Sequence, residues 1–481
     1  MKIVLFALNS SYSHTNLAIR CLRPHLLEGG FEVRLAEGNL RDTDGSLLDM
    51  LVAEKGDIYG FSCYIWNIDA ILPIVSDLKK ILPDAVTVLG GPEVSYGTER
   101  FEDLGFVDHI VCGEGEGAML ELCSELRRKA CPPKIIRSEN HGLTEGSLYA
   151  GGETDKKLFY YESSRGCPYA CAYCLSSATR GVIAKDAETT LAELYEFEKH
   201  PGGITVKLVD RTFNFDKTRA NAIWRGLLDE KYTKNYHFEI CASLLDEESF
   251  DILAKFPKGK VQLEVGLQST NERTLASCAR HIDPDSVLNA CRRIVEFGNV
   301  HLHLDLICGL PGDSFDSVGE AFDRAYSACS LLQVGFLKLL HGTALRRDAE
   351  KLGIKYRDKA PYEVLSTPDI SYAELRKLHT VSDLLERYRD GGAFEATLDY
   401  GISLALSPFR FFCLLSEFIE EKDGRSIRKI GQNDAYRLIY AFIASLEGCD
   451  FKILDSAIHG DYSKNEVRRA PAYWQKEVKK K

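Results

Sequence analysis

The sequence predicts an α/β protein of three consecutive domains, with residues 131–157 as a linker between the first two. Residues 1–130 and 158–350 each alternate apolar runs with amphipathic stretches, a pattern typical of parallel sheets covered by helices. Over residues 355–481 the alternation stops and helical periodicity remains. At 481 residues the chain is too long for one hydrophobic core, so three domains fit its length.

The first domain is expected to have a flavodoxin-like or Rossmann-like fold. In such a doubly wound sheet, ligands bind at the carboxyl ends of the strands. Two of these ends carry glycine-rich turns, Gly90-Gly91-Pro92-Glu93 and Gly113-Glu114-Gly115-Glu116. The expected strands are 3–8, 32–36, 58–62, 86–89 and 109–111, and the expected helices are 17–27, 47–54, 68–82, 98–104 and 118–129.

The second domain is expected to be an open, partial (β/α)6 barrel, because its strand–helix units are too few to close an eight-stranded one. The site of a barrel lies at the carboxyl ends of its strands. The expected strands are 158–163, 205–209, 237–241, 261–265, 301–307 and 333–340, with helices at 191–199, 219–229, 284–297 and 316–330.

The third domain is expected to be all-helical, with helices at 373–388, 393–406, 409–422 and 433–447. It carries no motif that indicates a role, and closing the barrel mouth is one hypothesis. The basic residues Lys476 and 479–481 are interpreted as a solvated tail.

Composition and net charge limit the kinds of substrate and binding partner that we expect. A net charge of −11 argues against nucleic acid and favours a small-molecule or peptide substrate. No run reaches the roughly 18 apolar residues of a membrane span, and the N-terminus is typical of a strand rather than a signal peptide. We therefore expect a cytoplasmic protein, in which most of the 15 cysteines are small buried side chains rather than disulfides.

The segment from Cys167 to Cys174 is the strongest chemical signal in the chain. It reads Cys167-Pro168-Tyr169-Ala170-Cys171-Ala172-Tyr173-Cys174, a C-x3-C-x2-C spacing. Three thiolates on one loop can hold three irons of a cubane cluster and leave the fourth iron open for chemistry. A closed zinc site is the alternative, but it needs a fourth ligand, and no His lies within ten residues of Cys167 or Cys174.

This loop, placed after the first strand of a partial barrel, resembles the radical S-adenosylmethionine (SAM) superfamily over residues 155–350. The resemblance implies that Cys167, Cys171 and Cys174 hold a 4Fe–4S cluster and that SAM chelates its open iron. It also implies that an electron, supplied by an external flavodoxin-type or ferredoxin-type donor, cleaves SAM to a 5′-deoxyadenosyl radical that abstracts a substrate hydrogen.

The resemblance extends to the ends of the later strands. Residues 264–269 resemble the family's Glu-x-Gly-x-Gln-Ser strand end, whereas Asp210 stands in a sequence that departs from the common Gly-Gly-Glu motif. Taken one at a time, each of these strand-end residues also has a structural explanation, such as helix capping, a buried ion pair or a turn. The implied SAM contacts are Tyr173, Asp210, Ser243, Glu264, Gln268, Arg280 and Gly309.

The order of the first two domains resembles cobalamin-binding radical SAM proteins. The resemblance implies that the two glycine-rich turns approach the corrin through Gly90, Gly91, Pro92, Glu93, Gly113 and Glu114. The family's Asp-x-His-x-x-Gly cobalt-ligand motif is absent, which leaves His14 as a candidate ligand or as a residue that caps a helix. A domain that no longer binds cobalamin is the alternative.

Lys338 lies in the last part of the sixth expected strand and His341 directly after it, so in that register both point toward the site. They are candidates to bind a substrate carboxylate or to donate a proton; a solvated rim is the other interpretation. We predict a radical SAM enzyme that methylates an unactivated carbon with the help of cobalamin. The alternatives are a non-methylating radical enzyme (rearrangement, cyclisation or ring contraction) and a non-catalytic iron–sulfur protein.

Overall fold

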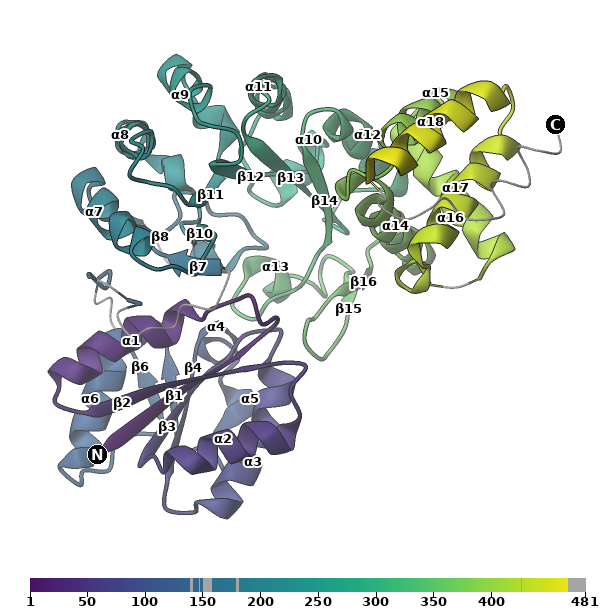
Figure 1. The fold of residues 1–481 in the computed structure, drawn as a ribbon. Helices are drawn as coiled ribbons and strands as arrows, with labels where there is room; N and C mark the ends of the chain where they lie inside the picture. The colour runs from purple at the N-terminus through teal and green to yellow at the C-terminus, as the bar shows by residue number, and fades with distance from the viewer. Residues whose placement is uncertain (139–141, 147, 150–157, 179–180, 425, 466–481) are drawn as a thin grey trace. The chain divides into compact units, whose positions relative to one another are not determined.

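The computed structural model describes residues 1–138, 142–146, 148–149, 158–178, 181–424 and 426–465 (Figure 1). The chain divides into two compact units. The first comprises Met1–Leu263, Lys338–Ala349 and Tyr356–Glu363, and the second comprises Glu264–Leu337, Glu350–Lys355 and Val364–Lys481. Part of the expected linker and the basic C-terminal residues lie outside the described residues.

The first sheet is six-stranded with the order β2-β1-β3-β4-β5-β6, and its pairs are parallel. The order of its first five strands is flavodoxin-like, as predicted. A sixth strand, Ile135–Arg137, joins β5 from within the range expected to be a linker. The strands are β1 Lys2–Asn9, β2 Glu32–Asn39, β3 Ile58–Ser62, β4 Val86–Gly90, β5 His109–Cys112 and β6 Ile135–Arg137.

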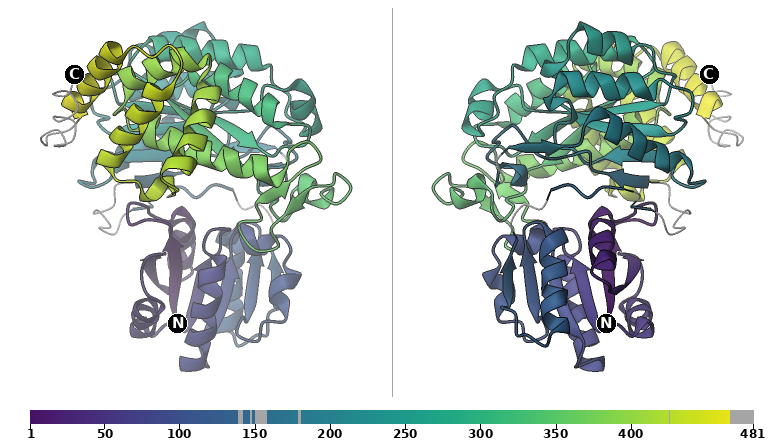
Figure 2. Two further views of the ribbon diagram at one scale, coloured as in Figure 1. Left: turned by 90° about the vertical axis from the view of Figure 1, so that its right-hand side faces the viewer. Right: turned by 90° about the vertical axis from the view of Figure 1, so that its left-hand side faces the viewer.

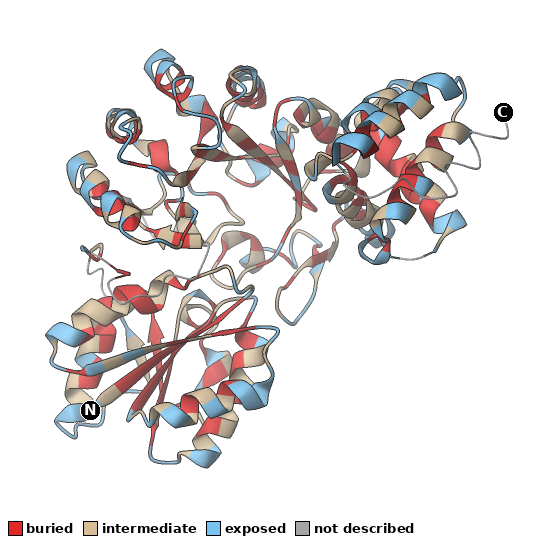
Figure 3. Ribbon diagram, viewed as in Figure 1, coloured by how far each residue is buried: buried red, intermediate tan, exposed pale blue. Residues whose placement is uncertain are grey.

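Helices cover both faces of this sheet (Figure 1). On one face α1 packs with α6, and on the other α2 packs with α3. The helices are α1 Leu17–Glu28, α2 Asp44–Glu54, α3 Ile68–Ile81, α4 Pro92–Ser95, α5 Glu99–Glu102 and α6 Gly115–Arg127. Because both faces are covered, the central strands β1 and β3 are nearly continuous in buried residues (Figure 3).

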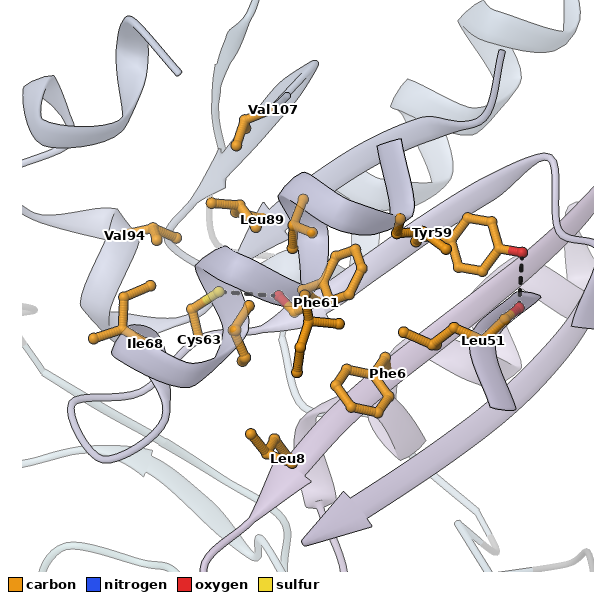
Figure 4. Close-up of a cluster of buried hydrophobic side chains, with 14 of the residues drawn as sticks. Phe6, Leu8, Leu51, Tyr59, Phe61, Cys63, Ile68, Leu89, Val94 and Val107 are labelled. Atoms are coloured by element: carbon orange, nitrogen blue, oxygen red, sulfur yellow. Dashed lines mark hydrogen bonds between the residues drawn. The ribbon is translucent and has the colours of Figure 1, made fainter. Parts of the chain in front are cut away.

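The core on the α2–α3 face is built from large aromatic and branched side chains (Figure 4). The rings of Phe6 and Phe61 meet edge to face with centroids 5.8 Å apart. The Tyr59 hydroxyl is buried in this core and donates a hydrogen bond to the Leu51 carbonyl at 3.0 Å. Aromatic packing and a satisfied polar tip together stabilise the face on which α3 lies.

The second sheet has the order β14-β13-β12-β11-β10-β7, in which each strand neighbours the next in sequence, as expected of an open partial barrel. Helices line the outer side of these strands in both views of Figure 2. The strands are β7 Leu158–Tyr161, β10 Thr205–Leu208, β11 Asn235–Ile240, β12 Val261–Gln268, β13 His301–Cys308 and β14 Leu331–Phe336; the helices are α7 Ala187–Glu198, α8 Lys217–Leu227, α9 Glu247–Leu253, α10 Glu272–Ser277, α11 Pro284–Glu296 and α12 Phe315–Tyr326.

The sixth barrel strand ends at Phe336 rather than at residue 340. Beyond it the chain turns away: Lys338 forms an isolated antiparallel bridge with Glu363, and the Leu339 N–H donates to the Tyr362 carbonyl at 3.0 Å. Lys338 and His341 therefore lie after the strand, contrary to the expected register. The short elements that follow are α13 Ala344–Arg347, β15 Lys355–Tyr356 and β16 Val364–Ser366.

The C-terminal region is helical, as predicted, and contains one helix that was not expected, α18. Asp461 of α18 is buried and accepts hydrogen bonds from the Thr397 hydroxyl and N–H at the start of α15. This contact satisfies donors that the first turn of a helix leaves open. The helices are α14 Tyr372–Leu385, α15 Glu395–Ala405, α16 Pro408–Lys422, α17 Gln432–Ser445 and α18 Phe451–Asn465.

In the part of the chain that the structure describes, no single helix is long and apolar enough to cross a membrane. The pair α15–α16 passes the same test of length and composition only when both helices are taken together, and it is bent by 97° at the break between them.

Two isoleucines on α3 offer a test of the first core. Ile71 is fully buried, whereas Ile81 is 51% exposed. We expect Ile71→Ala to destabilise the protein by about 2–5 kcal/mol, because it leaves a cavity, and Ile81→Ala to change stability by less than about 0.5 kcal/mol. Urea unfolding followed by circular dichroism measures both. Equal midpoints for the two variants would contradict the buried position of Ile71.

Candidate functional site

The cysteine loop begins at a point held by backbone geometry. β8 (Ser164–Gly166) pairs antiparallel with β9 (Val182–Ala184), and Gly166 stands directly before Cys167. Gly166 has a φ of +99°, and a Cβ there would lie 2.2 Å from the Gly181 carbonyl oxygen. Only glycine fits this position, so the direction in which the loop leaves the ribbon is determined.

None of the three cysteines forms a disulfide; Cys171 is buried, whereas Cys167 and Cys174 are partly exposed. The Cys174 N–H donates to the Cys171 carbonyl at 3.1 Å, which gives the loop a tight turn. Within the described residues, no three His, Cys, Asp or Glu side chains are arranged to hold a single metal ion. A cubane cluster makes a different demand, since each cysteine binds its own iron. Three adjacent free thiols, two of them accessible, fit that group.

Side chains from the next two strand ends surround the loop. The Thr212 hydroxyl lies 3.5 Å from the sulfur of Cys167, and the Tyr169 hydroxyl donates to the sulfur of Cys241 at 3.3 Å. The predicted SAM contact Ser243 is exposed, with its hydroxyl 3.2 Å from the same Cys241 sulfur. The sequence analysis missed Thr212; its position two residues after Asp210 on the same strand end was the available signal.

The structure places Asp210 in a buried hydrogen-bond network, and its contact with SAM stays a prediction. Its side chain is 0% exposed and accepts hydrogen bonds from the Ser163 N–H at 2.8 Å, the Ser164 N–H at 3.1 Å and the Ser163 hydroxyl. Arg219 closes the network by donating to the Ser163 hydroxyl at 2.6 Å. Burial raises the pKa of Asp210, and the hydrogen bonds from Ser163 and Ser164 oppose that rise. The carboxylate thus holds the strand end before the cluster loop.

Tyr173 keeps its predicted position, partly exposed between Cys171 and Cys174 in the first unit. Glu264, Gln268, Arg280 and Gly309 lie in the second unit. Their contact with SAM stays a prediction.

The polar face of β12 fits a missing ligand. Gln268 has a φ of +72°, and its side-chain oxygen is buried with no hydrogen-bond partner within the described residues. Its amide nitrogen occupies the space over Gly266, where an added Cβ would lie 2.3 Å away, and Arg280 donates to the Gly266 carbonyl. A buried acceptor without a donor is costly unless a ligand supplies one, and SAM carries hydroxyl and ammonium donors.

Gly309 follows β13 with a φ of +88°, and a Cβ added there would lie at ordinary van der Waals distances from Val364 and Leu375. The glycine is therefore required by the backbone turn itself. Gly309 is buried in the structure.

The carboxyl edge of the first sheet is bare at the predicted cobalamin turns. A Cβ on Gly90 would meet only the Val111 carbonyl oxygen, 3.9 Å away, and Gly113 is exposed with a φ of +90°. Gly91 has another reason to be glycine: its φ is +111°, and a Cβ would lie 2.6 Å from the Cys63 carbonyl oxygen. Pro92 is exposed at the start of α4. The edge fits a large planar ligand.

An aromatic pair that the sequence analysis did not single out lies beyond the end of β3. Tyr64 and Trp66 stack with ring centroids 4.2 Å apart, and Trp66 is 50% exposed. A large exposed indole at the ligand-binding edge of a doubly wound sheet provides an apolar surface for a planar ring. The signal available in the sequence was a tryptophan shortly after a predicted strand end.

His14 is half-buried against the first barrel strand. Its Nδ1 lies 2.6 Å from the Tyr160 hydroxyl, and the two rings stack with centroids 6.0 Å apart. Burial, and secondarily Lys207, lowers the pKa of His14. The imidazole is therefore biased toward its neutral form, which any metal ligand needs. Its role as a cobalt ligand stays a prediction.

The carboxylates of the two predicted cobalamin turns already have protein partners. Glu93 is buried and pairs with Arg100 at 2.9 Å, and Tyr362 contacts the same carboxylate. Glu114 lies 3.1 Å from Arg165. A contact from either carboxylate to cobalamin would compete with these ion pairs, so the backbone of each turn is the better candidate surface.

His341 packs into this same region. Its Nδ1 lies 2.5 Å from the place where a Cβ on Gly97 would be, and its ring meets Tyr362 edge to face. Burial, helped by Arg100 and Arg346, lowers the pKa of His341 to about 4. The imidazole is neutral at pH 7 and so carries no proton to donate as an imidazolium. Lys338 is exposed beside Glu363. The catalytic role of either residue stays a prediction.

Three family matches agree with these domains. Residues 3–123 match the B12 binding domain, residues 161–325 match the radical SAM superfamily, and residues 350–481 match DUF4080, a family of proteins of unknown function. The chain therefore contains a B12-binding domain followed by a radical SAM domain.

Two curated relatives are methyltransferases. The chain is 25% identical over 356 residues to the cobalamin-dependent radical SAM methyltransferase TokK of Streptomyces tokunonensis, covering 65% of this chain and 52% of TokK. It is 29% identical over 305 residues to 2-(S-pantetheinyl)-carbapenam-3-carboxylate methyltransferase of Streptantibioticus cattleyicolor, covering 54% of this chain and 43% of that enzyme. The chain thus spans about half the length of these relatives.

Solved structures share the fold. The radical SAM methyltransferase TsrM from Kitasatospora setae, solved with cobalamin and a [4Fe-4S] cluster bound, superposes with a TM-score of 0.59 at 17% identity, covering 75% of this chain and 78% of TsrM. The cobalamin-dependent SAM radical enzyme OxsB superposes with a TM-score of 0.65 at 13% identity, covering 96% of this chain and 84% of OxsB.

Asp210→Asn tests the support of the cluster loop. The amide places a donor where the carboxylate accepted hydrogen bonds, so we expect a loss of about 1–3 kcal/mol of stability and less iron bound per chain. Iron and sulfide assays after anaerobic reconstitution measure the second effect. Asp251→Asn, an exposed carboxylate on α9, is the matched control and should bind iron as the wild type does. Wild-type iron content in Asp210→Asn would overturn the positioning role.

Proposed function

We propose that the protein is a radical SAM enzyme that methylates an unactivated carbon of a small-molecule or peptide substrate with the help of cobalamin. The observation that carries the proposal is the loop of Cys167, Cys171 and Cys174, three free thiols after the first strand of the barrel. The match to a B12 binding domain over residues 3–123 adds the second cofactor. When bound, the cluster supplies the electron that cleaves SAM, and cobalamin supplies the methyl group.

The protein's own residues would hold the cofactors in place and shield the reaction from water. Gly166 and Asp210 hold the start of the cluster loop, and the three thiolates would bind one iron each. The buried side-chain oxygen of Gln268 can accept a hydrogen bond, and no described residue donates one to it. Arg280, which follows α10 and donates to the Gly266 carbonyl of β12, would bind a carboxylate through its guanidinium. These groups together match the hydroxyl, amino and carboxylate groups of SAM.

Two features support a small substrate and a reducing compartment. The net charge of −11 disfavours a polyanion. All the cysteines are free thiols, which agrees with the cytoplasm. TsrM, which shares the fold, has been solved with its tryptophan substrate and a SAM analogue. An external flavodoxin-type or ferredoxin-type donor would supply the electron.

A non-methylating radical enzyme is the second candidate function. The observation that favours it is the absence of the Asp-x-His-x-x-Gly motif, because a B12-like domain without a cobalt ligand can serve another purpose. Product analysis separates the two. S-adenosylhomocysteine with 5′-deoxyadenosine supports methyl transfer, and 5′-deoxyadenosine alone supports the second candidate. Neither product, from a protein with an intact cluster, supports a non-catalytic role.

Cys171→Ala tests the cluster. After anaerobic reconstitution with iron, sulfide, hydroxocobalamin, reductant and SAM, this variant should form no 5′-deoxyadenosine above the enzyme-free background, because two thiolates cannot retain the cluster in a reactive form. Chromatographic quantification of the nucleoside is the measurement. Cys131→Ala removes an exposed thiol and should match the wild type. Full activity of Cys171→Ala would refute the proposed function.

Trp66→Ala tests the cobalamin edge. Removing the exposed indole that stacks on Tyr64 should weaken hydroxocobalamin binding about tenfold, or about 1.4 kcal/mol, through loss of aromatic contact. Titration followed by the cobalamin absorption spectrum gives the Kd. Tyr372→Ala, which removes an exposed aromatic at the start of α14, is the control and should leave the Kd unchanged. An unchanged Kd for Trp66→Ala would place the corrin elsewhere.

A further inference from the structure

Arg165 joins the cluster loop to the first domain. It lies on β8, two residues before Cys167. Its Nη2 is 2.7 Å from both Glu116 Oε1 and Glu162 Oε2, and its Nη1 is 3.1 Å from Glu114 Oε2. Glu114 is the residue that precedes α6 and Glu116 lies in the first turn of that helix, whereas Glu162 lies between β7 and β8. One guanidinium thus holds together residues from the two predicted cofactor sites.

This contact has an excess of negative charge, because three carboxylates face a single guanidinium. Burial by itself would lower the pKa of Arg165, but Glu162 and Glu116 outweigh it and raise that pKa, so the side chain stays charged. Burial raises the pKa of Glu162 despite the ion pair with Arg165. Without the guanidinium, three half-buried or buried carboxylates would repel one another, and the turn and the loop would separate.

A second, indirect connection joins the same loop to the β4–α4 turn. The Leu345 N–H of α13 donates to the Ala172 carbonyl, between Cys171 and Cys174, at 2.9 Å. In the same stretch of chain, the Tyr362 hydroxyl contacts Glu93 and accepts a hydrogen bond from Arg100 at 2.6 Å. All of these residues lie in the first unit. The loop is therefore tied to the β5–α6 turn directly and to the β4–α4 turn through α13 and Tyr362.

The structure assigns to Arg165 the role of a positioning residue that sets the distance between the cluster loop and the cobalamin-binding edge of the first domain. The role rests on the proposed function, because it matters only when both cofactors are bound. The three carboxylates occupy the guanidinium through Nε, Nη1 and Nη2, so Arg165 acts through the loop and does not serve as a ligand of SAM. Glu114 and Glu116 act with it as the other half of the contact.

Arg165→Gln and Arg165→Lys test this role, with Arg225→Gln as the matched control. Arg225 forms an exposed ion pair with Glu248, away from the cluster loop in sequence and structure. On the protein without added cofactors, amide hydrogen exchange of residues 113–118 and 163–176 should be about tenfold faster in Arg165→Gln. Lysine keeps the charge but lacks the planar fork, so Arg165→Lys should show a smaller increase of about threefold. The control should match the wild type.

A second readout uses the loaded protein. With iron and cobalamin contents equal to the wild type, Arg165→Gln should weaken the magnetic interaction between the reduced cluster and cob(II)alamin in electron paramagnetic resonance spectra. A purely structural role would instead lower the cofactor contents. The ratio of S-adenosylhomocysteine to 5′-deoxyadenosine should fall as well, because a displaced cobalamin leaves the radical uncoupled from methyl transfer.

Wild-type exchange in both peptides of Arg165→Gln would overturn the inference. If that variant fails to fold, a folded Arg165→Lys protein with wild-type exchange overturns it equally. Loss of cofactor contents in place of a changed magnetic interaction would also overturn it. If the wild type produces neither nucleoside product, the proposed function fails, while the exchange experiment on the unloaded protein still decides the contact.

Discussion

The buried carboxylate of Asp210 is the constraint on which the candidate site depends. It accepts hydrogen bonds from both backbone and side chain of Ser163, which stands between the first barrel strand and the cysteine loop. Arg219 binds the same serine from α8, so residues from three segments converge on one strand end. A buried charge without these partners would be strongly unfavourable, so the network forms completely or not at all. That requirement gives the loop a rigid origin, which a cluster with one open iron needs.

Around this origin several charged side chains bind one another, whereas the α2–α3 face of the first domain is packed mainly with apolar side chains. Phe6, Phe61 and Ile71 exclude water from the α2–α3 face without directional bonds. Near the cysteines, in contrast, Asp210, Arg165 and Arg219 each bind several partners. Apolar packing tolerates small displacements, but charge-assisted hydrogen bonds weaken sharply when atoms move by a fraction of an ångström. The molecule therefore uses directional bonds where cofactor geometry matters.

The fold was largely predictable because its strands and helices are long and periodic. The strands expected in the first domain form one sheet and those expected in the barrel form another. The elements that were missed are short or weakly patterned. β6 has three residues and becomes a strand only by pairing with β5, and α18 presents a polar residue, Asp461, to its core because that side chain caps α15. β14 was expected to continue to residue 340, but a bridge between Lys338 and Glu363 takes the chain away after Phe336.

Cysteine spacing and glycine-rich turns were readable from the sequence alone, because three ligands on one loop and bare strand ends are local properties of the chain. The environment of each polar side chain, in contrast, could not be predicted from the sequence. Asp210 and Gln268 both follow the pattern of a polar residue at a strand end, yet one is saturated by Ser163 and Ser164 and the other keeps a buried acceptor with no described donor. Likewise, nothing near Arg165 in the sequence indicates Glu114 or Glu116. Tertiary structure alone decided these pairings, because burial and hydrogen-bond partners depend on residues that are distant in sequence and meet only in the folded chain.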